Sequence, residues 1–148
     1  MNEGEEFLRV YGPVQLATAR VQCWKCQAET PVRSLVAEDV EEFFDNGDAP
    51  ERLGNRTFVF SVGADEMPPD FRDRLADLAP EFKPSYSRTV GGSYWASCCT
   101  SCNALQGAFF LHSEPDGPFF GGPAEFKGEL TPLSDRGFDA LEASYTMT

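Results

Sequence analysis

Two short motifs dominate this sequence: Cys-Trp-Lys-Cys at residues 23–26 and Cys-Thr-Ser-Cys at residues 99–102. In each motif two residues separate the cysteines, so one tight turn can aim both thiolates at a common point. Strand-like segments flank the motifs, at residues 14–21 and 32–36 around the first and at residues 93–98 before the second. The pattern predicts two β-knuckles whose four sulfurs meet.

The donor set of these knuckles matches a tetrahedral zinc site, because zinc in structural sites takes four thiolate or imidazole ligands. The sequence therefore predicts one structural zinc ion, held by Cys23, Cys26, Cys99 and Cys102. Between the two pairs lie 72 residues. Loop-closure entropy grows only with the logarithm of length, so a long insertion costs little extra.

The residue after each cysteine pair often needs a left-handed backbone conformation, which Asn tolerates and Gly prefers. Asn103 follows the second pair and suits this requirement, whereas Gln27 follows the first pair and suits it less well. The local residue choice therefore supports the second knuckle more strongly than the first.

Other roles for the cysteines remain open. A CxxC pair can be a redox dithiol at a helix N-terminus, but Thr30-Pro31-Val32 follows the first pair too closely for such a helix. Cys98 adjoins Cys99 in a predicted strand, where successive side chains alternate, so it is expected to be a small buried residue. Using Cys98 in place of Cys99 as a ligand would give the looser spacing CxxxC.

The chain between the pairs predicts a mixed α/β insertion at about residues 37–90. Apolar residues recur at helical spacing from Val36 to Phe44, and Gly47 is a suitable end for this helix. Residues 56–62 alternate and are rich in β-branched and aromatic side chains, which predicts a strand. Residues 71–79 predict a second helix.

The region after the second pair is expected to return as a strand at residues 108–112 and then form a Gly/Pro loop at residues 115–123. Ser134 suits the N-cap of a last helix, within a helical segment at about residues 130–146 that presents Phe138, Leu141 and Tyr145.

The 148 residues are enough for a single domain, residues 1–148, with its own core. The expected fold class is α+β. A zinc ribbon is expected from two β-knuckles, at about residues 14–36 and 93–120, with the long α/β insertion between the two cysteine pairs.

The charge of the chain is strongly negative, with 24 acids against 12 bases and a formal net charge of -12. Such a surface repels nucleic acid and anionic membranes and attracts basic proteins. No apolar run reaches the roughly 18 residues that a membrane helix needs, and the acidic N-terminus is unlike a secretory signal. We therefore expect a cytoplasmic protein with reduced cysteines and no membrane partner.

Much of the excess charge falls within residues 38–81, which hold 13 acids and four bases. Acids on the expected first helix would lie opposite its apolar face, either as a partner-binding surface or simply as a solvated face. Two phenylalanines in the Gly/Pro loop are either tucked under the core or exposed as an apolar anchor. The candidate partner-binding residues are Glu38, Asp39, Glu41, Glu42, Asp45, Asp48, Phe119 and Phe120.

A second hypothesis is an enzyme with a pocket around His112, Glu114 and Asp116, which form the pattern His-x-Glu-x-Asp. A single histidine on a phenylalanine-rich segment is more often a core or edge residue. A third hypothesis, a nucleic-acid-binding zinc ribbon, is disfavoured by the net charge.

Residues 21–36 and 93–120 together resemble small bacterial zinc-ribbon-like proteins of unknown function. The resemblance rests on Cys-Trp-Lys-Cys followed by Thr-Pro-Val, and on Tyr-Trp-Ala leading into the second pair and the stretch Leu-Gln-Gly-Ala-Phe-Phe-Leu-His-Ser-Glu-Pro. It implies zinc and a bacterial source, and it implies no activity. The leading hypothesis is a non-enzymatic, zinc-stabilised protein-binding module with a basic protein partner. One version of it is an immunity protein that neutralises a toxin.

Overall fold

The computed structural model describes residues 7–44, 46–53, 56–88, 91–141 and 143–147. Strands account for 51% of these residues and helix for 13%, and the sheets are antiparallel. The expected α+β zinc ribbon with a long α/β insertion is therefore wrong. The segment between the cysteine pairs does not form a separate insertion, because its strands belong to the same sheets as the knuckles.

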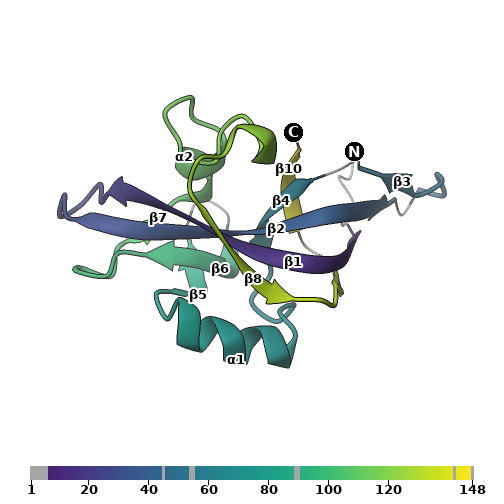
Figure 1. Cartoon of the computed structure of the whole chain (residues 1–148), viewed down its shortest axis with the longest axis horizontal. Helices are drawn as coiled ribbons and strands as arrows, with labels where there is room; N and C mark the ends of the chain where they lie inside the picture. Colours follow the sequence, from purple (N-terminus) through teal and green to yellow (C-terminus); the bar gives the residue numbers. More distant parts are fainter. Residues whose placement is uncertain (1–6, 45, 54–55, 89–90, 142, 148) are drawn as a thin grey trace.

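The larger sheet is built on a long hairpin of β1 (Phe7–Gln22) and β2 (Glu29–Phe43) (Figure 1). Its main path runs in the order β10-β4-β2-β1-β8, with two short strands added at the sides, β3 on β2 and β9 on β1. The other strands of this sheet are β3 (Glu51–Arg52), β4 (Thr57–Val62), β8 (Glu129–Ser134), β9 (Phe138–Ala140) and β10 (Ala143–Met147).

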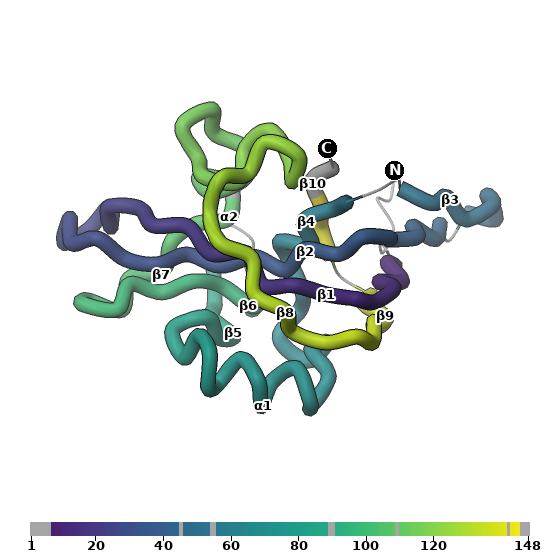
Figure 2. Tube along the Cα trace, in the orientation of Figure 1, coloured from purple at the N-terminus to yellow at the C-terminus, as the bar shows by residue number. Residues whose placement is uncertain are grey.

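The smaller sheet has the order β5-β6-β7 and lies on the same side of the long hairpin as helix α1 (Figures 1 and 2). Helix α2 lies on the opposite side. These elements are β5 (Phe82–Ser87), β6 (Gly92–Cys98), β7 (Leu105–Gln106), α1 (Pro69–Leu78), α2 (Ala108–His112) and the 3-10 turn η1 (Pro123–Glu125). None of the helices in the described ranges is long and apolar enough to cross a membrane.

Two apolar clusters pack against the two faces of the larger sheet. The first joins sheet residues such as Leu16 and Leu35 to Leu75 of α1 and Trp95 of β6. The second, on the opposite face, contains six buried residues: Ala17, Val32, Val36, Phe58, Leu111 and Phe119. The long hairpin is therefore covered on both faces, which explains why β2 reads as a nearly continuous apolar run at its centre.

Several predicted elements are confirmed. Residues 14–21 lie in β1 and residues 32–36 lie in β2, while the strands expected at 56–62 and 93–98 appear as β4 and β6. The helix expected at residues 71–79 appears as α1, with Pro69 in its first turn and Phe71 and Leu75 buried.

Three predicted elements are wrong. The helix expected from Val36 to Gly47 is the continuation of β2, which stays paired with β1 as far as Phe43. Residues 108–112 form α2 instead of a strand. The helical segment expected at 130–146 is replaced by β8, β9 and β10. Ser134 does not cap a helix there, since its Oγ accepts the Arg136 N–H within a turn.

Candidate metal centre

Both cysteine pairs form β-knuckles with the same backbone hydrogen bonds. In the first, the Cys23 N–H donates to Ala28 O and the Gln27 N–H donates to Cys23 O, each at 2.9 Å. In the second, Cys99 and Asn103 make the matching bonds, also at 2.9 Å. Gln27 and Asn103 have φ angles of 66° and 67°. The expected left-handed backbone conformation is thus present after both cysteine pairs. It is present even at Gln27, a residue type that adopts it less readily than Asn.

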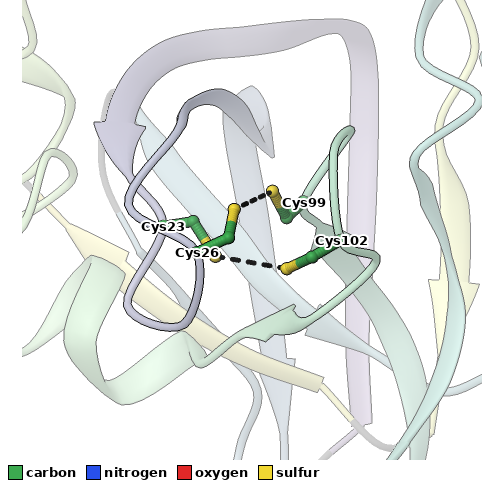
Figure 3. A group of neighbouring side chains, drawn as sticks. All are labelled: Cys23, Cys26, Cys99 and Cys102. Atoms are coloured by element: carbon green, nitrogen blue, oxygen red, sulfur yellow. Dashed lines mark hydrogen bonds between the residues drawn. The ribbon is translucent and has the colours of Figure 1, made fainter.

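The four sulfurs of the knuckles converge between the tip of the long hairpin and the β6–β7 turn (Figure 3). The Sγ atoms of Cys23 and Cys102 lie 3.6 Å apart, as do those of Cys26 and Cys99. All four atoms lie within 4.8 Å of one another. Four sulfurs about 2.3 Å from a tetrahedral zinc ion would be roughly 3.8 Å apart. The arrangement therefore fits a tetrahedral metal ion and is too wide for disulfides, since bonded sulfurs lie about 2.05 Å apart.

Backbone N–H groups inside each turn point at the first sulfur of that pair. The Lys25 N–H lies 3.3 Å from Cys23 Sγ, and the Ser101 N–H lies 3.3 Å from Cys99 Sγ. The pKa of Cys23 is lowered to about 6, chiefly by the backbone N–H of Cys26, with Lys25 adding to the effect. The pKa of Cys99 is likewise lowered, chiefly by the backbone N–H of Cys102. These two thiols are thus prepared to lose their protons.

Cys26 behaves differently. The backbone N–H of Ala28 lowers its pKa, but burial and the neighbouring thiols, beginning with Cys99, together raise it to about 11. Crowding of several thiols disfavours a further negative charge among them. A cation held between the sulfurs would remove this repulsion, as expected for a metal-binding donor set.

Contacts outside the sulfurs hold the two knuckles together. Thr30 Oγ1 accepts the Thr100 N–H at 3.1 Å, and the exposed Trp24 indole donates to Leu105 O at 2.7 Å. Further along the hairpin, the Arg33 N–H donates to Ser97 Oγ at 2.8 Å. The first knuckle is thereby tied to β6 and β7 through side chains and backbone.

A nearly buried ion pair reinforces this connection. Arg33 Nε donates to Glu81 Oε2 at 2.8 Å, and the two side chains are 16% and 10% exposed. Arg33 Nη1 also donates to Thr18 Oγ1 at 2.9 Å. The guanidinium therefore links β1 and β2 to the residue just before β5. No local sequence pattern predicts this pair, because 48 positions separate its members.

Cys98 lies outside the sulfur cluster, as expected from the alternation of β6. Its side chain is buried, with 3% exposed, and its sulfur lies 3.3 Å from Ser85 Oγ. The cluster uses Cys99. The spacing argument for Cys99 over Cys98 is consistent with this geometry.

The residues of the enzyme hypothesis do not form one site. His112 is buried, with its ring stacked 4.1 Å from the Phe60 ring and 4.8 Å from the Phe119 ring, centroid to centroid. Burial lowers the His112 pKa to about 3. Its Nδ1 has no hydrogen-bond partner among the described residues. Glu114 and Asp116 are exposed, and among the described residues they form no metal-binding group with the buried histidine.

The candidate acids do not share one helix face, because the segment is a strand. Glu38 and Asp48 are exposed, and Asp45 lies outside the described residues. The other three acids already have partners within the molecule. Asp39 pairs with Arg52, Glu41 accepts the Tyr11 hydroxyl at 2.7 Å, and the buried Glu42 accepts the Tyr145 hydroxyl at 2.9 Å.

The two loop phenylalanines divide between the two expected alternatives. Phe119 is fully buried and its ring packs 5.1 Å from the Phe58 ring. Phe120 is 47% exposed. Phe119 thus anchors the Gly/Pro loop in the second apolar cluster, and its neighbour faces solvent.

A groove of about 470 Å³ is lined by residues of β1 and β8, by Glu38 of β2 and by Arg74 of α1. Its lining includes Glu38 and Asp135, both exposed, and Arg74, whose Nη2 donates to Pro132 O at 3.2 Å. Neither Glu38 nor Asp135 has an ion-pair partner in the part of the chain that the structure describes. The groove brings together two acids that are far apart in the sequence, so sequence reasoning found only Glu38.

Comparison with known proteins gives no relative: no family model matches the chain, and neither a curated protein nor a solved structure is significantly similar to it. The resemblance to small bacterial zinc-ribbon-like proteins therefore stays a prediction. What the geometry establishes is a four-cysteine cluster that could hold a metal ion.

Proposed function

We propose that this chain is a zinc-stabilised binding module for a basic protein partner. The observation that carries the metal assignment is the set of four Sγ atoms within 4.8 Å of one another. Four thiolates in a tetrahedral arrangement favour zinc, or iron in iron–sulfur proteins, over the harder cations. Zinc is our choice because the site joins two tight turns through four cysteines, as closed structural zinc sites do.

In this role the metal would close the tip of the long hairpin onto the smaller sheet. Residues 23–28 lie at the end of a hairpin whose strands are 16 and 15 residues long. Structural zinc contributes directly to the folding free energy of the small domains that bind it. In isolated zinc-finger peptides this contribution is on the order of 10 kcal/mol. The proposed ion would therefore order the hairpin tip and fix its position relative to β6 and β7.

The support for a basic partner is electrostatic. The net charge of -12 favours encounter with positively charged proteins. Glu38 and Asp135 offer two unpaired carboxylates in one groove, and a groove of about 470 Å³ has room for a long basic side chain. We place the partner's Lys or Arg side chain in this groove. Neutralisation of a toxin, as an immunity protein, is one form that such binding can take.

The metal part of the proposal is tested by measuring zinc, iron and thiol content of the purified protein. One zinc per chain with five reduced cysteines supports it. A colourless, folded protein without metal, or a protein with one iron per chain, contradicts the zinc assignment.

The partner part is tested by affinity capture with the wild-type chain, purification of the captured protein, and calorimetric titration of the purified pair. Glu38→Lys combined with Asp135→Lys should weaken binding at least tenfold, and added salt should weaken wild-type binding by screening. The control carries the same charge change on two exposed acids outside the candidate set, Glu114→Lys with Asp116→Lys. Equal effects of the two double variants would exclude the groove. A captured partner that is acidic would exclude the proposal.

A further inference from the structure

The two knuckles correspond residue by residue beyond the cysteines. In each, the residue five positions after the first cysteine is an alanine that accepts the N–H of that cysteine, Ala28 in one and Ala104 in the other. The residue seven positions after the first cysteine is Thr30 in one knuckle and Gln106 in the other. Both are buried, with 0% and 2% exposed.

These equivalent residues reach across to the opposite knuckle. Thr30 Oγ1 accepts the backbone N–H of Thr100 at 3.1 Å. Gln106 Nε2 donates to Cys23 Sγ at 3.4 Å and to Ala104 O at 2.9 Å. The amide is thus fixed by its own knuckle and directed at a sulfur of the other.

This contact makes the sulfurs unequal. Cys23 Sγ receives the Lys25 N–H and the Gln106 amide, while Cys99 Sγ receives the matching Ser101 N–H and no comparable side-chain donor among the described residues. A donor to a thiolate withdraws charge and fixes the direction of the sulfur. A four-thiolate zinc site carries a net charge of about -2 and lies in a chain that is already acidic, so an additional donor should favour the bound state.

We propose that Gln106 is a positioning residue of the metal centre, which holds the Cys23 sulfur in place and lowers its charge through an N–H···S hydrogen bond. The inference rests on the proposed metal site. Thr30 links the two knuckles through a hydrogen bond to backbone, and no hydrogen bond from its side chain to a sulfur is present among the described residues. The two residues therefore form a natural pair of test and control.

The experiment compares Gln106→Met, which keeps the length and apolar bulk of the side chain but removes the donor, with Thr30→Val. Each protein is titrated with zinc against a competing chelator and then examined with cobalt(II) in place of zinc. Loss of a residue that hydrogen-bonds a metal ligand typically weakens metal affinity about 10–100-fold. We expect Gln106→Met to weaken zinc affinity by an amount within this range. We also expect it to shift the sulfur-to-cobalt charge-transfer band. Thr30→Val should leave that band unchanged even where it lowers thermal stability.

Gln106→Asn gives a second variant that keeps a buried amide but shortens it, so it should reproduce the band shift if Gln106→Met does not fold. If the wild-type chain binds metal, and both Gln106 variants keep its affinity and its charge-transfer band, the role of Gln106 is refuted. The metal proposal would then still stand. A wild-type chain that binds neither zinc nor cobalt would overturn the metal proposal and this inference together.

Discussion

Mild acid should destabilise this protein through its single histidine. His112 is 4% exposed between the rings of Phe60 and Phe119, and burial lowers its pKa to about 3. In the unfolded chain its pKa should be about 6.5. The unfolded state therefore takes up the proton first as the pH falls. The stability contribution of neutral His112 is fully present above about pH 6.5 and is lost progressively towards pH 3.

The expected loss between pH 7 and pH 5 is about 2 kcal/mol, at about 1.4 kcal/mol per pH unit once the unfolded histidine is protonated. Arg33, which lines the same small cavity as His112, adds no acceptor for an imidazolium and already pairs with Glu81. Urea unfolding followed by circular dichroism at the two pH values gives the free energies directly.

The matched variant is His112→Phe, which keeps a ring between Phe60 and Phe119 and removes the unpartnered Nδ1. All other ionisable side chains are the same in both proteins, so the difference between the two proteins isolates the histidine. His112→Phe should lose about 2 kcal/mol less than wild type on going from pH 7 to pH 5. Identical losses in the two proteins would show that His112 is accessible to protons in the folded state, against the burial described above.

Four further substitutions test the packing and the knuckles. Phe119→Ala should lower the free energy of unfolding in urea by about 3–5 kcal/mol, because its ring is fully buried. Phe120→Ala should lower it by less than about 0.5 kcal/mol. Similar losses in the two variants would contradict the assignment of Phe119 as the loop anchor. Cys98→Ala should keep the full metal content and lose about 1 kcal/mol, and loss of metal would show that the ligand is misassigned. Gln27→Gly should stabilise the folded state by up to about 1 kcal/mol, because glycine adopts the positive φ of this position without strain. A decrease in melting temperature would show that the positive φ of Gln27 is not strained.

The cysteine cluster could be predicted from the sequence because its information is local. The spacing of two residues within each pair already fixes the geometry of a knuckle, whatever lies between the pairs. Gln106 was missed, although a signal was present: it stands at the same offset from Cys99 as Thr30 does from Cys23. Only the structure shows that both residues cross to the opposite knuckle.

The error over residues 36–47 has a specific cause. Val36 and Val40 lie four positions apart, and a spacing of four agrees with a helix about as well as with a strand. In the structure they belong to opposite apolar clusters, because the β1–β2 register shifts between Tyr11 and Val14. The strand forms because β1 supplies a partner as far as Phe43, which is information that a local pattern does not contain.

The C-terminal error is similar. The sequence pattern predicts Phe138 and Tyr145 on one helix face, but they pair with Val10 of β1 and Val59 of β4. Leu141, expected on the same face, is 47% exposed. The pairing partners lie more than 80 positions away in the chain, so the helical spacing of these three residues is coincidental.

In the proposed metal centre, one zinc ion joins the two knuckles through four cysteine sulfurs. X-ray absorption at the zinc edge of the purified protein tests this arrangement, because it reports the identity, number and distance of the ligand atoms. We expect four sulfur neighbours at about 2.3 Å and no nitrogen or oxygen neighbour. A shell that contains nitrogen or oxygen ligands, fewer than four sulfurs, or no bound zinc in folded protein would contradict it.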